Sequence, residues 1–188
     1  FVTSSSPVSA GACLGSGIGP TKIDEVVGVV KAYTTRVGEG PFPTELHDRE
    51  GEQLRAVGQE YGATTGRPRR CGWFDLVVAR YAARVNGLTS LAITKLDVLD
   101  ILDEIKVCTA YQYQGETIEE FPADINILQD CQPVYEVLPG WSSKIGQISE
   151  YDSLPVQAKQ YLDYLESKIK IPISMVSVGP MRDRTIHK

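Results

Sequence analysis

Three arginines stand within four positions of one short segment: Arg67, Arg69 and Arg70. Pro68 lies among them, and because proline fixes its own φ and has no N–H donor, the segment cannot be the interior of a helix. We therefore predict a loop over residues 62–73, in which glycine and threonine precede the arginines. Each guanidinium presents a planar fork of donors that fits a carboxylate or a phosphate. The loop is a candidate site for a small anion; the alternative is a cluster of surface salt bridges.

A second candidate site follows a short apolar run, residues 91–94, which we predict to be a buried parallel strand. Lys95, Leu96 and Asp97 come directly after it. In open α/β sheets, ligands bind beyond the carboxyl ends of the strands. A carboxylate there can accept two hydrogen bonds from guanine, whereas adenine offers an acceptor and would leave the carboxylate unpaired. The stem of Lys95 can cover the base. The alternative is that both charges merely end a strand.

Two further segments could contact a nucleotide. Ser177-Val178-Gly179-Pro180 ends another apolar run and could close over a base, although a simple strand-ending turn is the alternative. Residues 11–19 are rich in glycine and precede a predicted helix, as phosphate-binding loops do. They fit neither common phosphate-loop pattern, and Lys22 falls too late for a phosphate-loop lysine. We expect a packing loop there.

The elements that must hold these segments indicate a mixed α/β fold. Helical spacing of apolar residues predicts helices over residues 22–32, 48–59, 73–85 and 155–170. Apolar runs predict extended segments over 33–37, 91–94, 133–138 and 171–177, and a hairpin of 105–113 with 116–121. On the third helix we expect the core face to hold Leu76, Val77, Tyr81 and Val85. We expect Asn86-Gly87 to end that helix.

Composition limits the class of protein. The chain has 188 residues, a formal charge of −5 and 42% hydrophobic residues, which fits one globular domain. No apolar run approaches the ~20 residues that cross a bilayer, and the acidic total disfavours a nucleic-acid binder. Four cysteines without a CxxC pair, and only two histidines, predict reduced thiols and no metal site. The chain begins without methionine on a predicted strand end, so we expect a fragment of a longer protein.

Together these motifs resemble one family, the adenylosuccinate synthetases, in its C-terminal portion. The matching stretches follow the family's order over essentially the whole chain: residues 2–5, 15–20, 31–45, 62–73, 94–100, 138–141 and 177–180. Their combination is specific, although none of them decides the matter alone. Pro68 stands where some relatives have another arginine. Thr94 stands where the guanine motif of GTP-binding proteins has asparagine.

The resemblance implies a GTP-dependent ligase that joins IMP and L-aspartate to give adenylosuccinate, GDP and phosphate, with Mg²⁺ required. It implies one domain over residues 1–188, the C-terminal part of a P-loop-NTPase-like fold. That fold has a mixed, mostly parallel sheet flanked by helices, with an added β-hairpin. It also implies a cytoplasmic protein that forms a homodimer at full length, with no nucleic-acid or membrane partner.

By position, the resemblance assigns residues to three substrates. IMP would contact Thr3 and Arg67, with Val37 near its ribose. Aspartate would be held by a loop that closes as a lid, made of Ala63, Thr64, Thr65, Gly66, Arg67, Pro68 and Arg69. GTP would be held by Arg69, Lys95, Leu96, Asp97, Ser177, Val178 and Gly179.

The family's N-terminal phosphate loop, catalytic aspartate and catalytic histidine have no counterpart in this sequence. Neither His47 nor His187 lies in a motif that could replace that histidine. We therefore expect no catalytic residue in this segment and no activity of the segment alone. Two alternatives stay open: a non-catalytic guanine-nucleotide-binding α/β module, and an anion- or RNA-binding domain that uses the arginine loop. The acidic total and the few exposed-looking aromatic residues disfavour the second.

Overall fold

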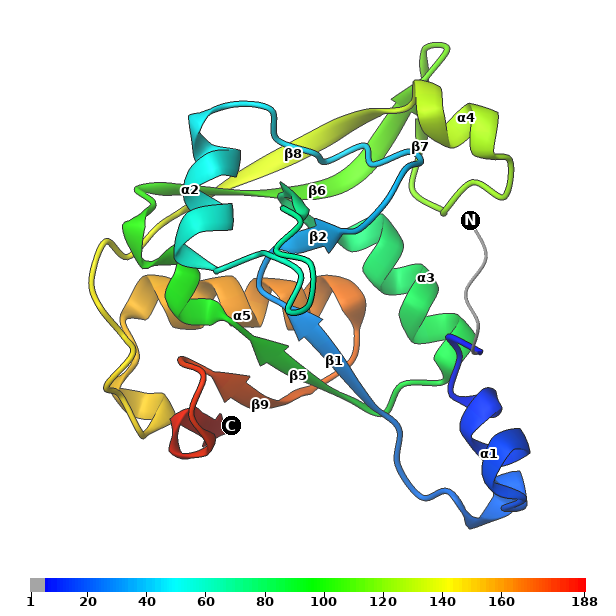
Figure 1. Cartoon of the computed structure of the whole chain (residues 1–188), viewed down its shortest axis with the longest axis horizontal. Coiled ribbons are helices and arrows are strands. Elements are labelled where there is room, and N and C mark those ends of the chain that lie inside the picture. Colours follow the sequence, from blue (N-terminus) through cyan, green and yellow to red (C-terminus); the bar gives the residue numbers. More distant parts are fainter. Residues whose placement is uncertain (1–5) are drawn as a thin grey trace.

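The computed structural model describes residues 6–188, so the predicted strand end at residues 1–3, with Thr3, lies outside the described residues. Its main sheet has the strand order β1 (Val27–Lys31), β5 (Ser90–Thr94), β9 (Ile173–Ser177) and β10 (Thr185–His187). The first three strands are parallel to one another, and β10 is antiparallel to β9. This confirms the prediction of a mixed, mostly parallel sheet, which Figure 1 shows in the lower half of the view.

The parallel register aligns the carboxyl ends of three strands at one edge of the main sheet. Lys31 lies opposite Thr94 on the neighbouring strand, and Ile93 lies opposite Val176 on the next. Each strand is five residues long. The residues that follow β1, β5 and β9 therefore emerge side by side, where ligands of open α/β sheets bind.

Helices α3 (Leu76–Asn86) and α5 (Val156–Ile169) belong to the same hydrophobic core as the main sheet. The carboxylate of Asp75 begins α3 by accepting hydrogen bonds from two backbone N–H groups of its first turn. Gly87 ends that helix in the left-handed conformation, as predicted. The buried residues of α5 recur every three or four positions, which confirms the predicted amphipathic helix: Ala158, Tyr161, Leu162, Leu165 and Ile169.

A second sheet is built around β6 (Glu104–Tyr113), the long strand at the top of Figure 1. It pairs antiparallel with β8 (Gln132–Pro139) and β7 (Glu116–Ile118), and parallel with the two-residue β4 (Phe74–Asp75). The predicted hairpin over residues 105–121 is confirmed. A third, two-stranded sheet joins β2 (Thr34–Arg36) to β3 (Arg70–Gly72). Helix α2 (Arg49–Val57) confirms the helix expected over residues 48–59.

The helix predicted over residues 22–32 is wrong. After a 3₁₀ turn, η1 (Pro20–Lys22), the chain forms strand β1, because the β-branched run around Gly28 pairs with β5. Gly28 packs closely against Leu88: a Cβ there would lie 2.5 Å from Leu88 Cδ1, so a side chain would require the leucine to move. The packing loop expected at residues 11–19 is also wrong in part, since α1 (Ala10–Ser16) is helical and ends at Gly17 with φ of 70°.

Other differences concern burial and short elements. Tyr81 and Val85 are exposed, because the buried face of α3 runs through Leu76, Val77 and Ala83 instead. The sequence did not predict α4 (Ile125–Asp130), β10 or the short 3₁₀ helices, which are η2 (Leu96–Ile101), η3 (Tyr151–Ser153) and η4 (Arg182–Arg184). Within residues 6–188, no helix combines the length and the apolar character that a membrane crossing requires.

Candidate functional site

The two predicted guanine-binding segments meet at one cavity. A hollow of about 250 Å³ lies beyond the carboxyl ends of β5 and β9, and both segments contribute to its wall. Its lining residues are Val57, Gly58, Gln59, Lys95, Asp97, Val98, Gly179 and Pro180. The C-terminal end of α2 forms the third side, which the sequence did not indicate. A cavity of this size accommodates a planar ring system.

Two predicted residues of this site can contribute only their backbone. Leu96 and Val178 are fully buried, and their side chains belong to the hydrophobic core. Ser177 donates from its hydroxyl to the carbonyl of Gly179 at 2.9 Å, and this bond holds the turn after β9. The side chains of Lys95 and Asp97 are therefore the polar groups that this wall offers to a ligand.

Asp97 has no side-chain hydrogen bond to another residue within 6–188, although it is half-buried. Burial raises the pKa of this carboxyl, while its own backbone N–H and the charge of Lys95 act in the opposite direction. A half-buried carboxylate without a partner costs free energy. A ligand that donates two hydrogen bonds, as guanine does, would offset this cost.

The arginine segment is a closed turn rather than an open loop. An isolated bridge pairs Tyr61 with Pro68, and Gly62 N–H donates to the carbonyl of Arg67 at 2.9 Å. Gly66 adopts φ of 65° and donates back to Gly62 at 2.8 Å. The tip, residues 63–66, is exposed, so its hydroxyl and amide groups are accessible.

The three arginines have different environments. Arg67 is exposed, and its guanidinium has no hydrogen bond or ion pair with any residue of the described chain. Arg70 belongs to β3, where it makes a two-pronged ion pair with Glu45, with Nε 2.8 Å from Oε1. Arg70 also donates to the carbonyls of Gly38 and Gly40. The expectation that all three arginines are displayed for an anion is therefore wrong for Arg70, whose donors hold the segment after β2.

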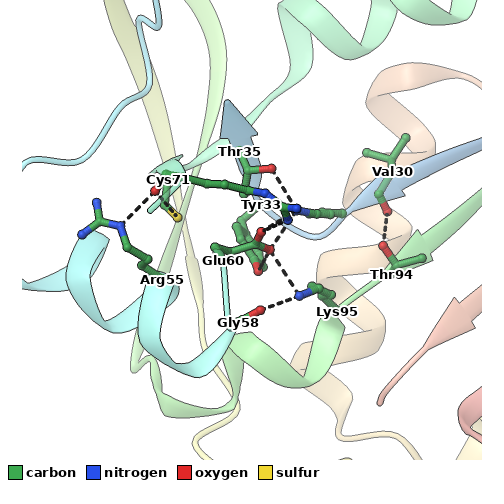
Figure 2. Close-up of polar contacts among 11 residues, drawn as sticks. Val30, Tyr33, Thr35, Arg55, Gly58, Glu60, Cys71, Thr94 and Lys95 are labelled. Atoms are coloured by element: carbon green, nitrogen blue, oxygen red, sulfur yellow. Dashed lines mark hydrogen bonds and ion pairs between the residues drawn. The ribbon is translucent and has the colours of Figure 1, made fainter. Parts of the chain in front are cut away.

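Arg69 points to a residue that the sequence did not indicate, Glu60. The side chain of Glu60 is 0% exposed, and its Oε2 accepts a hydrogen bond from Arg69 Nη1 at 2.8 Å. Lys31 Nζ lies 2.8 Å from both carboxylate oxygens, Tyr33 donates to Oε1 at 2.6 Å, and Lys95 Nζ lies 3.3 Å from Oε1. Figure 2 shows Glu60 between Tyr33 and Lys95. We call Lys31, Tyr33, Glu60, Arg69 and Lys95 the Glu60 cluster.

The end of α2 places Glu60 at this position. Gly58 caps the helix, and Gln59 follows with φ of 49°, which turns the chain sharply. A side chain at Gly58 would collide with the hydroxyl of Tyr33, 2.2 Å from an ideal Cβ. Lys95 also donates to the carbonyl of Gly58 and adopts φ of 59° itself. Two positions in the uncommon left-handed region therefore bring the carboxylate and Lys95 together.

Electrostatics keep Glu60 ionised. Burial alone would raise the pKa of its carboxyl, but hydrogen bonds from Lys31, Tyr33 and Arg69 outweigh burial and lower the pKa to about 2. Burial, together with Glu60, raises the pKa of Tyr33 far above its usual range. The same two causes raise the pKa of the neighbouring Cys71 thiol to about 11, so it stays neutral. The cluster thus holds one carboxylate against three cations.

Sequence patterns gave little indication of this cluster. Glu60 lies three residues after the end of α2 and two residues before Gly62, in a connecting segment where a carboxylate is usually solvated. The sequence singled out Arg69 and Lys95, but not as partners of a common carboxylate. Lys31 could also have been singled out, because it is a charge at the end of an apolar run and carboxyl ends of strands collect functional residues. Val37, expected near a ribose, lies exposed in the segment after β2, and no contact places it.

The described residues bring no three His, Cys, Asp or Glu side chains together as a metal site. The Mg²⁺ that the resemblance implies therefore has no ligand cluster in this part of the chain. Cys13, Cys71, Cys108 and Cys131 are unpaired thiols, as predicted.

Together these residues define an α/β protein with a polar site at the carboxyl edge of a mostly parallel sheet. A family model described as adenylosuccinate synthetase matches residues 1–186, and the chain belongs to that family. The adenylosuccinate synthetases of Desulforamulus reducens and Gloeobacter violaceus are each 60% identical to it over 186 residues. These matches cover 99% of this chain and 44% and 42% of the relatives.

A solved structure gives the same result. The fully ligated adenylosuccinate synthetase from Plasmodium falciparum superimposes with a TM-score of 0.97 at 44% identity, over 100% of this chain and 45% of that one. This likeness confirms the predicted fold over the matched residues. The chain spans less than half the length of the relatives it matches.

Proposed function

We propose that the full-length protein carrying this chain is a GTP-dependent ligase that joins IMP and L-aspartate to give adenylosuccinate, GDP and phosphate. The observation that carries this proposal is the meeting of Lys95, Asp97 and Gly179 at one cavity. There the Asp97 carboxylate has no side-chain partner among residues 6–188. Family membership supports the same reaction. In this proposal the present chain binds and orients substrates, and no catalytic residue is assigned to it.

GTP would bind with its base in the cavity. Asp97 would accept from the ring N–H and the exocyclic amine of guanine, and the Lys95 stem would cover one face of the ring. Leu96, Ser177, Val178 and Gly179 would line the other side through backbone groups and the Ser177 turn. Adenine would leave Asp97 unpaired in a half-buried position, so the cavity would select guanine by an unmet hydrogen-bonding requirement.

L-Aspartate would bind at the turn tip. The exposed and unpartnered guanidinium of Arg67 offers a two-pronged donor for a carboxylate. The neutral donors of the turn, which surround it, would hold the second carboxylate: Ala63, Thr64, Thr65, Gly66 and the backbone before Pro68. Arg67 and Thr3 would also contact IMP, with Val37 near its ribose.

Arg69 would lie between L-aspartate and GTP. The reaction transfers a phosphoryl group from GTP to the 6-oxygen of IMP. The amine of aspartate then forms a bond to C6, the bond from C6 to the phosphorylated oxygen breaks, and phosphate leaves. Charge develops on the transferred phosphoryl group, and a fixed guanidinium nearby stabilises that charge. Closure of the turn over aspartate would exclude water from the activated intermediate.

Three further properties belong to this proposal. Mg²⁺ would be required, with ligands outside the described residues. The full-length protein would be a homodimer, and it would act in the cytoplasm. A Mg²⁺ titration of the reaction rate tests the metal requirement, and equilibrium sedimentation tests the homodimer.

A non-catalytic guanine-nucleotide-binding module is the alternative function, because the same cavity would serve it. The two are separated by an assay of the full-length protein with all three substrates and with each one omitted. If the protein is the ligase, adenylosuccinate should form only in the complete mixture, together with equal amounts of GDP and phosphate. Guanine-nucleotide binding without any adenylosuccinate would favour the module and contradict the ligase.

A further inference from the structure

The Glu60 cluster brings together four partner residues from three separate segments of the chain. Lys31 ends β1 and Tyr33 lies just before β2, Arg69 lies at the end of the turn, and Lys95 follows β5. All four reach the same carboxylate at 2.6–3.3 Å. The backbone reinforces one of these links, since Arg69 N–H donates to the Glu60 carbonyl at 2.9 Å. Movement of any one segment would disturb the contacts of the others.

The cluster is asymmetric in exposure. Glu60 is 0% exposed, whereas Lys31, Arg69 and Lys95 keep 26%, 31% and 37% of their side chains accessible. The carboxylate therefore cannot touch a substrate, but its cationic partners can. Three cations around one anion leave an excess of two positive charges at the surface of the site.

Stability alone does not explain such a cluster. Buried ion pairs are costly to desolvate, and apolar side chains of similar volume often replace them without loss of stability. The partners of Glu60 are also not arbitrary. Arg69 lies on the turn proposed to hold aspartate, and Lys95 lies in the cavity proposed to hold guanine. Among residues 6–188, Glu60 is the single side chain that bonds to both Arg69 and Lys95.

We propose that Glu60 is a positioning residue that fixes Arg69 and Lys95 relative to each other, so that the aspartate turn and the guanine cavity are set by one shared carboxylate. This inference rests on the proposed function. Lys31, which neither substrate is proposed to contact, completes the cluster by adding the charge that keeps Glu60 ionised next to Tyr33.

The test is the kinetics of Glu60→Gln in the full-length protein. Glutamine keeps the shape but removes the charge, so Arg69 and Lys95 lose their common anchor. We expect the KM values for aspartate and for GTP to rise together, each about 10-fold or more, as for the loss of one member of a buried charge pair. Glu60→Asp keeps the charge and should recover part of both losses.

Asp75→Asn is the matched control. Asp75 is also a buried carboxylate that accepts a tyrosine hydroxyl and backbone N–H groups, but it contacts neither substrate segment. The Asp75→Asn substitution should lower the free energy of unfolding and leave the KM values for aspartate and GTP within about 2-fold of wild type. A merely structural Glu60 would behave like Asp75, with loss of folded protein and unchanged KM values.

Tyr33→Phe keeps the test decisive where Glu60→Gln does not fold, because it removes one of four donors and keeps the ring. It should raise both KM values about 2- to 5-fold. Unchanged KM values for both substrates in the folded variants, or a rise for only one substrate, would overturn the inference. If wild type itself makes no adenylosuccinate, the proposed function fails instead, so the two failures are distinguishable.

Discussion

Nη1 of Arg69 lies 2.8 Å from Oε2 of Glu60, so the arginine proposed to lie between two substrates is anchored by a carboxylate that no substrate can reach. Its neighbours in sequence differ. Arg67 is exposed without a partner in the described chain, and Arg70 is bound to Glu45. Three arginines within four positions therefore have three environments: one is exposed, one is anchored to a buried carboxylate, and one is bound within the fold. The proposed function gives ligand contacts to the first two only.

The first prediction compares Arg67→Leu with Arg70→Leu. Arg67 has no folded-state partner within residues 6–188, so its loss should change the free energy of unfolding by less than about 0.5 kcal/mol. It should still raise the KM for aspartate about 100-fold through the lost two-pronged contact. Arg70→Leu should cost about 2 kcal/mol, because it leaves Glu45 and two backbone carbonyls unpaired.

Urea unfolding and steady-state kinetics measure the two effects separately. A large loss of stability in Arg67→Leu, with unchanged aspartate kinetics, would mean that this arginine supports the fold instead.

The second prediction concerns acid. The pKa of Glu60 is about 2 in the folded state, below its ordinary value of 4.5. A lowered carboxyl pKa stabilises the fold above the unfolded value, and this contribution is lost as pH falls through the folded value. It amounts to about 3 kcal/mol, an order-of-magnitude figure for a fully buried group. Wild type should therefore exceed Glu60→Gln in stability by a constant amount above about pH 4.5 and lose this advantage towards pH 2.

Urea unfolding of both proteins at a series of pH values gives this difference. A stability difference that stays the same down to pH 2 would show that the charge of Glu60 does not contribute.

The third prediction tests the support beneath α3. The Tyr111 hydroxyl donates to Asp75 Oδ2 at 2.5 Å, and the other oxygen of Asp75 caps the helix. Tyr111→Phe removes one hydrogen bond from a buried carboxylate and should cost about 1–3 kcal/mol. Because neither residue lies at the substrate site, thermal unfolding should change while all KM values stay within about 2-fold. An altered KM for aspartate would contradict this separation of the two regions.

The fourth prediction uses the unpaired carboxylate. Burial raises the pKa of the Asp97 carboxyl in the folded protein. At a pH above that raised pKa the carboxyl is ionised, and the buried charge lowers the stability of the fold. Asp97→Asn removes that charge, so the unliganded protein should unfold about 2 °C higher at neutral pH. Such stabilisation at the expense of binding is typical of functional sites. A lower unfolding temperature in the variant would indicate that Asp97 has a stabilising partner.

Part of this site was predictable because of one rule of sheet geometry. Lys95 and Asp97 follow one predicted parallel strand and Ser177 ends another, so their meeting at the same edge could be expected. A loop over residues 62–73 was predicted from Pro68 and its glycines, and residues 62–69 do form a turn. The prediction is wrong for residues 70–72, which pair with β2 as strand β3. The helix predicted over residues 22–32 failed because apolar residues at 26, 27 and 30 match a helical spacing as well as a strand. Pairing with β5 decided between them.

Glu60 could not be predicted because its significance lies in contacts, not in spacing. Its partners come from residues 31, 33, 69 and 95, and no local pattern links them. The prediction that Arg70 is displayed for an anion is wrong for the same reason. Its type and position match those of Arg67, and only the tertiary position of Glu45 distinguishes the two residues.

The most direct measurement is the nucleotide preference of Asp97→Asn in the full-length protein. Asparagine still accepts the ring N–H but offers a donor where the carboxylate accepted the guanine amine, and xanthine has an acceptor at that place. If the cavity binds guanine through Asp97, the kcat/KM of the variant for GTP should fall about 100-fold or more and its kcat/KM for xanthosine triphosphate should rise, so that the preference reverses. An unchanged preference for GTP would contradict the assignment of the cavity to guanine.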